Sequence, residues 1–174
     1  DPVESSRQTR YEKLRTEIYE TDTEGSAVVA REIATLIRAK AEKGMACVLG
    51  IPGGSTPMKV YKELVKLHQR EGLSFKNVFI FNVNEFFPVR TKQHSNGKIL
   101  REYLINKVDL PEGHFFTPDE SITRDNVFEF CQNYEAKIEE LGGLDYVIAS
   151  IGMVGNLAYN EPGSQTGSTT RLML

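Results

Sequence analysis

Three polar or glycine-rich segments of the chain contain residues that could bind a ligand and move protons. They lie at residues 52–56, 84–93 and 152–164. The first offers glycines and hydroxyls, the second begins with an Asn-Glu pair, and the third contains two asparagines and a glutamate. Backbone amides and hydroxyls donate to anions, and carboxylates take and return protons. Such segments suit a compact anionic metabolite and acid-base chemistry upon it.

The segment Gly53-Gly54-Ser55-Thr56-Pro57 joins a predicted strand to a predicted helix. Free amides and the helix dipole favour an anion at such a junction, and phosphate is its natural guest. The segment lacks the Gly-Lys-Ser/Thr of a Walker A motif and the GxGxxG of a dinucleotide fold. From this pattern alone, a phosphate site and a simple tight turn before a capped helix both remain open. Lys59, in the first helical turn, either assists an anion or is a solvated surface lysine.

The run SIGMVGNLAYNEPGS, residues 150–164, follows from a predicted buried strand at residues 144–151. Gly152 and Gly155 allow the backbone to come close to a ligand. Asn156, Asn160 and Glu161 supply polar groups at the mouth of the predicted sheet, where ligands of open α/β sheets bind.

These segments resemble three motifs of the glucosamine-6-phosphate deaminase family. PGGSTP is similar to the phosphate loop that these deaminases share with 6-phosphogluconolactonases, and FNVNEF is similar to F-N-M-D-E-Y. The third run is similar to G-[IV]-G-x-D-G-H-[IL]-A-F-N-E-P. The resemblance covers the chain from about residue 16 onward. It implies a sugar-phosphate ligand, with Gly54, Ser55 and Thr56 as phosphate contacts, and we expect no cofactor and no metal.

The chain departs from this pattern where the family moves protons. Asn84 stands where the resemblance implies an Asp that shuttles a proton between C1 and C2 of the ring-opened sugar, and Val154 and Asn156 replace an Asp and a His. Neither valine nor an amide acts as a general acid or base near neutral pH. Because a general acid or base typically contributes about 100- to 10,000-fold to a rate, we expect very weak or absent deamination. Whether the chain is an enzyme stays open.

Two carboxylates remain as catalytic candidates. The resemblance implies that Glu161 supports the ring-opening His that is missing here, so Glu161 either binds a sugar hydroxyl or amine or caps local backbone. Glu85 follows Asn84, and neighbouring residues of an extended chain point in opposite directions. Glu85 therefore replaces the base only if the loop bends, and otherwise makes structural hydrogen bonds at the end of a strand.

Two further side chains have two interpretations each. His94 is either a substitute acid or a surface residue before a helix. Arg171 aligns with an Arg that the resemblance implies at an effector site for a related sugar phosphate, or it is a surface charge at a strand edge. The Arg and Lys that complete the family's phosphate site would lie beyond Leu174. The apolar run 172–174 predicts a strand that leads into further sequence, so we expect a longer parent protein, with an additional C-terminal domain as one option.

Predicted strands and helices alternate along the chain. Apolar runs predict strands at residues 16–21, 45–51, 77–83 and 144–151, and helical spacing predicts helices that begin near residues 22, 56, 95 and 123. This order predicts an α/β fold: a Rossmann-like parallel sheet with helices on both faces, truncated at its C-terminus. Residues 1–15 are interpreted as a polar arm with a short helix, and residues 16–174 as a single domain.

Composition excludes several classes of function. With 21 basic and 24 acidic residues, the net charge of −3 gives no general field for nucleic acid. No segment has the apolar length that crosses a bilayer, and no signal-peptide pattern is present, so we expect a cytoplasmic protein. Cys47 and Cys131 lack metal-site spacing and are expected to be packed thiols rather than a disulfide.

The sequence thus supports two functional hypotheses. The first is a divergent glucosamine-6-phosphate deaminase or isomerase-like domain of amino-sugar metabolism that binds a small-molecule sugar phosphate. The second is a non-catalytic sugar-phosphate sensor or structural module of a larger protein. Homo-oligomerisation is compatible with both. Dinucleotide binding rests only on the strand-helix alternation and a glycine loop, and no acidic ribose-binding residue stands where that fingerprint needs one.

Overall fold

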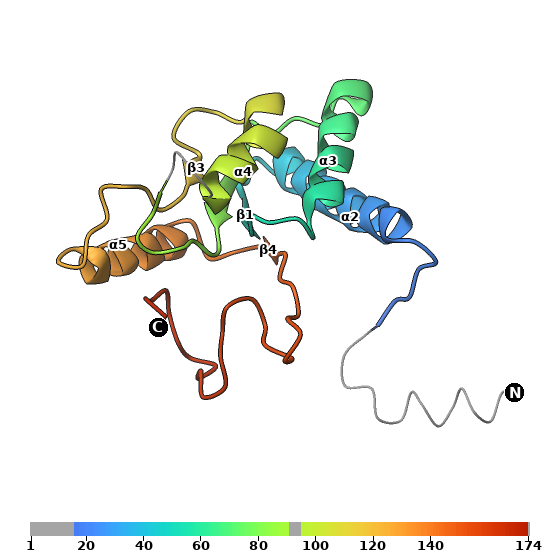
Figure 1. Cartoon of the computed structure of the whole chain (residues 1–174). Helices are drawn as coiled ribbons and strands as arrows, with labels where there is room; N and C mark the ends of the chain where they lie inside the picture. The colour runs from blue at the N-terminus through green and yellow to red at the C-terminus, as the bar shows by residue number, and fades with distance from the viewer. Residues whose placement is uncertain (1–15, 91–94, 174) are drawn as a thin grey trace, which may run out of the picture.

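The computed structural model describes residues 16–90 and 95–173. Its centre is a parallel sheet in the order β3-β2-β1-β4 (Figure 1). The strands are β1 (Cys47–Ile51), β2 (Val78–Asn82), β3 (Phe115–Phe116) and β4 (Tyr146–Val147). Leu49 pairs with Ile80 in the centre of the sheet, and Leu49 also pairs with Tyr146 of β4. The predicted α/β fold with a parallel sheet is confirmed.

Among the described residues, helix α2 (Asp22–Glu42) precedes β1, and the successive strands are connected by α3 (Met58–Glu71), α4 (Asn96–Tyr103) and α5 (Val127–Glu140). A 3₁₀ turn, η1 (Ile105–Lys107), follows α4. Local chemistry explains where several helices begin and end. The hydroxyls of Thr21 and Ser95 accept hydrogen bonds from the amides of Glu24 and Lys98, which caps α2 and α4. Gly72 closes α3 at a φ of +67°, a left-handed conformation that glycine adopts without steric cost.

Alternate residues of the central strands face different helices. Leu49, Ile51 and Ile80 belong to the main core, where they pack with buried residues of α2, α3 and α4. Phe81 points to the other face, where it stacks on Phe116 and meets Tyr134 of α5 edge to face. Helices α2, α3 and α4 lie on one side of the sheet, and α5 lies on the opposite side (Figure 1). Helices therefore cover both faces, as the sequence predicts.

Several predicted elements differ from the structure. Residues 16–21 form no strand, because this stretch leads straight into the Thr21 cap of α2. The strand expected at 144–151 is reduced to two residues, and its Val147 is 48% exposed, because β4 pairs only with β1 among the described residues. The predicted strand at 172–174 is also absent at its two described residues. The short strand β3 was not predicted.

Candidate functional site

The first two loops meet at the start of α4. A Cβ added to Gly53 would lie 2.5 Å from the Cα of Asn96, so the loop at 52–56 passes directly over that residue. The Asn96 side chain donates to the backbone carbonyl of Asn84 at 2.9 Å and to its Oδ1 at 3.0 Å. Asn96 is 4% exposed and was not predicted as a site residue. It thus joins the two loops that follow β1 and β2.

Glu85 caps α4. Its Oε1 accepts from the amide of Asn96 at 3.0 Å, and its Oε2 accepts from the amide of Gly97 at 2.9 Å. Oε1 also accepts from the amide of Phe86 at 3.0 Å. A carboxylate at this position satisfies free amides and complements the positive end of the helix dipole. Both oxygens are engaged, and this geometry favours the structural interpretation of Glu85 over a relocated base.

A second buried amide supports the same junction. Asn82 is 2% exposed at the end of β2, and its side chain donates to Thr117 Oγ1 at 3.0 Å. Its backbone carbonyl accepts from the Tyr134 hydroxyl at 2.9 Å. Burial raises the pKa of Tyr134, so its hydroxyl stays protonated and remains a donor at neutral pH. A polar residue that ends an apolar strand is the sequence signal that could have identified Asn82.

The loop at 52–56 leads into a helix without a side-chain cap. Pro57 occupies the N-cap position of α3, and no acidic residue lies in its first turn. Ser55 and Thr56 are exposed, and Gly54 has a φ of +106°, which favours glycine. The buried hydroxyl of Tyr61 donates to the carbonyl of Pro52 and fixes the start of the loop. Such a helix end can donate amides to an anion.

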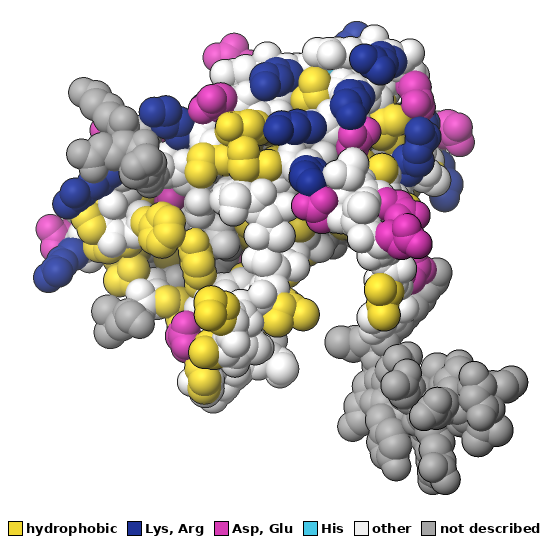
Figure 2. Space-filling model, turned by 45° about the vertical axis from the view of Figure 1, so that its right-hand side comes forward, with side chains coloured by type: hydrophobic (Ala, Val, Ile, Leu, Met, Phe, Trp, Pro, Cys, Tyr) yellow, Lys and Arg dark blue, Asp and Glu magenta, His cyan; other side chains and the backbone are white. Residues whose placement is uncertain are grey.

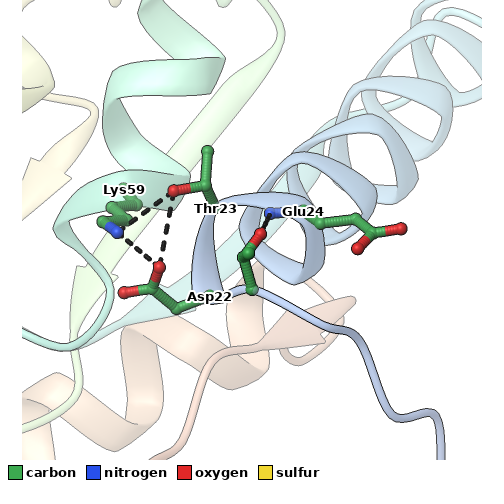
Figure 3. Close-up of polar contacts among 5 residues, drawn as sticks. Asp22, Thr23, Glu24 and Lys59 are labelled. Atoms are coloured by element: carbon green, nitrogen blue, oxygen red, sulfur yellow. Dashed lines mark hydrogen bonds and ion pairs between the residues drawn. The ribbon is translucent and has the colours of Figure 1, made fainter.

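Lys59 lies at the surface and is paired with the start of α2. Its ammonium group pairs with Asp22 and donates to Thr23 Oγ1 at 3.1 Å, as Figure 3 shows. Both partners lie at the start of α2, so this lysine connects the first turns of two helices. The hydrogen bond from Lys59 lowers the pKa of Asp22. Lys59 is therefore an exposed surface lysine, 46% exposed, whose ammonium group is paired with Asp22 rather than with the loop at 52–56.

The third loop begins with a small hairpin. Ile151 and Leu157 form an antiparallel bridge, the Gly152 amide donates to the Asn156 carbonyl at 2.8 Å, and the Ala158 amide donates to the Ser150 carbonyl at 2.9 Å. The side chain of Asn156 donates to the Ala158 carbonyl at 2.7 Å. The residue at the expected His position thus stabilises its own turn.

An aromatic contact connects the third loop to the second. The rings of Phe86 and Tyr159 lie 5.6 Å apart between centroids. Val154 is 78% exposed, and Glu161 is also exposed. Within the described part of the chain, the Glu161 carboxylate makes no hydrogen bond or ion pair. The three polar loops are therefore linked in series at the carboxyl ends of the strands.

Arg171 folds back onto the third loop. Its Nη2 donates to Asn160 Oδ1 at 2.9 Å and to Ser164 Oγ at 3.0 Å, on either side of Glu161 in the sequence. The adjacent Thr170 amide donates to Glu135 Oε2 of α5 at 3.0 Å. Arg171 is exposed but hydrogen-bonded to two side chains of the loop, so it is not an unattached surface charge.

The amino-acid sequence matches a known protein family. A family model described as glucosamine-6-phosphate isomerases/6-phosphogluconolactonase matches residues 20–158. The chain belongs to this family. The sugar-phosphate family that the three motifs predict is thereby confirmed.

Relatives within the family include a glucosamine-6-phosphate deaminase-like protein of Bacteroides thetaiotaomicron (strain ATCC 29148), 48% identical over 98% of this chain but over only 26% of that protein. Glucosamine-6-phosphate deaminase 2 of Giardia intestinalis is 36% identical over 86% of this chain and 55% of its own length. Among solved structures, a monomeric glucosamine-6-phosphate deaminase superposes with a TM-score of 0.81 at 29% identity, covering 89% of this chain and 62% of that one. The chain thus spans between a quarter and about three fifths of these proteins.

Two of the predicted features fall on residues that the structure does not describe. His94 and the arm at residues 1–15 lie outside the described residues. Within the described residues, no cluster of His, Cys, Asp or Glu side chains could hold a metal ion, and no helix is long and apolar enough to cross a membrane. Cavities of about 300 and 590 Å³ lie between α5 and residues 169–170 and along α2.

Proposed function

We propose that this chain is a glucosamine-6-phosphate deaminase/isomerase-like domain that binds a sugar phosphate in amino-sugar metabolism and deaminates it weakly or not at all. The phosphate lies on Gly54, Ser55 and Thr56. The observation that carries the proposal is the N-terminus of α3, which has no side-chain cap and no acidic residue in its first turn. At α4, by contrast, Glu85 already accepts hydrogen bonds from the amides of Asn96 and Gly97.

Weak catalysis follows from what occupies the expected proton-transfer positions. Asn84 accepts from Asn96, Asn156 donates to a carbonyl of its own hairpin, and Val154 carries no ionisable group. No carboxylate or imidazole stands at these three positions. Glu161, whose carboxylate is exposed, remains the candidate to bind a sugar hydroxyl or amine, and Arg171 remains the candidate to bind an effector.

A non-catalytic sensor or structural module is the second candidate. It is favoured by the Bacteroides relative, of which this chain matches only 26%, since a longer protein can use such a domain for recognition alone. In both cases we expect a cytoplasmic protein. Association into a homo-oligomer and an additional domain in the parent protein are compatible with both.

Calorimetric titration with glucosamine 6-phosphate tests the phosphate site. Thr56→Glu places a carboxylate on the exposed loop and should weaken binding by at least about tenfold, because like charges repel. Gln69→Glu adds the same charge at an exposed position near the other end of α3 and should leave affinity unchanged. Equal affinity for Thr56→Glu and the unmodified chain would place the phosphate elsewhere.

An ammonia assay tests the catalytic part of the proposal. The unmodified chain should release ammonia from glucosamine 6-phosphate only slowly or no faster than the protein-free reaction, and robust release would contradict the proposal. Asn84→Asp keeps the oxygen that accepts from Asn96, so it can be combined with Val154→Asp and Asn156→His. Detectable release by this triple variant would assign the loss to these positions. No gain would show that other parts of the family's site are also required.

A further inference from the structure

Phe86 and Tyr159 form an unusual pair in this protein. Their rings lie 5.6 Å apart and are inclined at 42°, yet Phe86 is 56% exposed and Tyr159 is 43% exposed. The other aromatic contacts among the described residues involve buried or half-buried rings, such as Phe81 with Phe116. Burial in the core therefore does not explain this pair.

The pair lies beside the polar residues of the proposed site. Phe86 directly follows Glu85, and Tyr159 directly precedes Asn160 and Glu161. Glu85 and Asn84 both bond to Asn96, against which the loop at Gly53 packs. A continuous chain of contacts thus leads from the proposed phosphate loop to the two rings.

The chemistry of this neighbourhood suits the carbon skeleton of a sugar. Aromatic faces carry negative charge in their quadrupole, and they attract the weakly positive C–H groups that line the face of a sugar. The amide of Asn160 and the carboxylate of Glu161 can bond to hydroxyl or amino groups at the edge of the same sugar. Small-molecule sites in proteins combine such apolar walls with a few polar groups.

We propose that Phe86 and Tyr159 together form the surface that binds the sugar ring or chain of a hexose phosphate whose phosphate lies on residues 54–56. This rests on the proposed function and deepens it, because it assigns recognition of phosphate and of carbohydrate to separate groups. The affinity for inorganic phosphate then depends on residues 54–56 alone, whereas the affinity for a sugar phosphate depends on these residues and on the two rings.

Calorimetry with inorganic phosphate and with glucosamine 6-phosphate separates the two contributions. Phe86→Ala and Tyr159→Ala should each weaken binding of glucosamine 6-phosphate by about 3- to 10-fold, the range that an aromatic contact gives, and should leave inorganic phosphate unchanged. The exchange of both rings, Phe86→Tyr with Tyr159→Phe, should retain binding. Met153→Ala removes another exposed apolar side chain from the third loop and should have no effect.

Three outcomes would overturn the proposal. If the alanine variants bind glucosamine 6-phosphate as the unmodified chain does, the rings do not contact sugar, although the phosphate site stands. If they weaken both ligands equally, or if Met153→Ala has the same effect, the rings act through general loop structure. If the unmodified chain binds neither ligand, the phosphate site and the sugar surface are both wrong. Near-ultraviolet circular dichroism checks that each variant retains the native fold.

Discussion

Single residues decide which chemistry is available to this domain. Asn84 and Glu85 are neighbours, but Asn84 bonds to the side chain of Asn96, whereas Glu85 binds the amides of Asn96 and Gly97. A carboxylate therefore stands one residue away from the expected base and is held in a structural role. Exchange of Asn84 for Asp would restore a proton carrier without removing the hydrogen-bond acceptor at this position.

The two cysteines should differ in reactivity. Burial, with a smaller effect of Asp145, raises the pKa of the Cys47 thiol to about 12, so almost no thiolate forms at pH 8. Burial also raises the pKa of Cys131, but this side chain is only half-buried. We expect iodoacetamide at pH 8 to modify Cys131 well before Cys47 in the native chain, as mass spectrometry would show. Rapid modification of Cys47 without denaturant would contradict the described packing.

At the scale of elements, the start of α4 organises the site. The helix receives the Ser95 cap, the Glu85 carboxylate and the side-chain contacts of Asn96 within its first turn. The loops after β1 and β2 are both positioned against it. The stability of this one turn therefore affects the geometry of two loops.

Glu85→Ala should lower the free energy of unfolding by about 2 kcal/mol or more, because it leaves amides of Asn96 and Gly97 without their acceptor. Urea unfolding followed by circular dichroism measures this loss. The matched control is Glu63→Ala, which removes a carboxylate paired with the half-exposed Lys66 on α3 and should cost less than about 1 kcal/mol. A loss for Glu85→Ala no greater than for Glu63→Ala would mean that Glu85 is free for another role.

At the scale of the whole molecule, contacts between segments distant in sequence hold the loop at 52–56 in position against α4. Gly53→Ala should destabilise the chain by about 1 to 3 kcal/mol, because the new methyl group would overlap Asn96. Thermal unfolding measures this effect. Gly167→Ala adds a methyl group where nothing lies within 4 Å and should leave the melting temperature unchanged. Equal behaviour of the two variants would show that the loop does not pack on α4.

Hydrogen bonds from Thr170 attach the C-terminal segment, residues 165–173, to Glu135 of α5. Glu135→Ala removes the acceptor of the Thr170 amide and hydroxyl, so cleavage near residues 165–173 should become severalfold faster in limited proteolysis. Glu129→Ala, at an exposed position in the first turn of α5, is the control and should leave the cleavage rate unchanged. An unchanged rate for Glu135→Ala would show that this contact does not restrain the segment.

The sequence predicted the central strands more accurately than the edge strand, because apolar runs in the centre of the sheet are buried on both faces. The runs that form β1 and β2 lie in the centre of the sheet, and their burial matches their composition. The run at 144–151 has similar composition, but its strand lies at the sheet edge, so only Tyr146 and Val147 pair. Whether a strand is central or at the edge depends on which strands lie beside it in space. The composition of the run does not contain that information.

The sequence by itself determined the family, the alternation of strands and helices, the phosphate-loop motif and the loss of proton-transfer groups at Asn84, Val154 and Asn156. These follow from residue type and order, and no folding is needed to see that valine carries no proton. Only the tertiary structure decided the partners of the remaining charged groups: Glu85 with α4, Lys59 with Asp22, and Arg171 with Asn160 and Ser164. The physical reason is that these contacts depend on distances of a few ångströms between groups that lie 7 to 37 residues apart in the sequence.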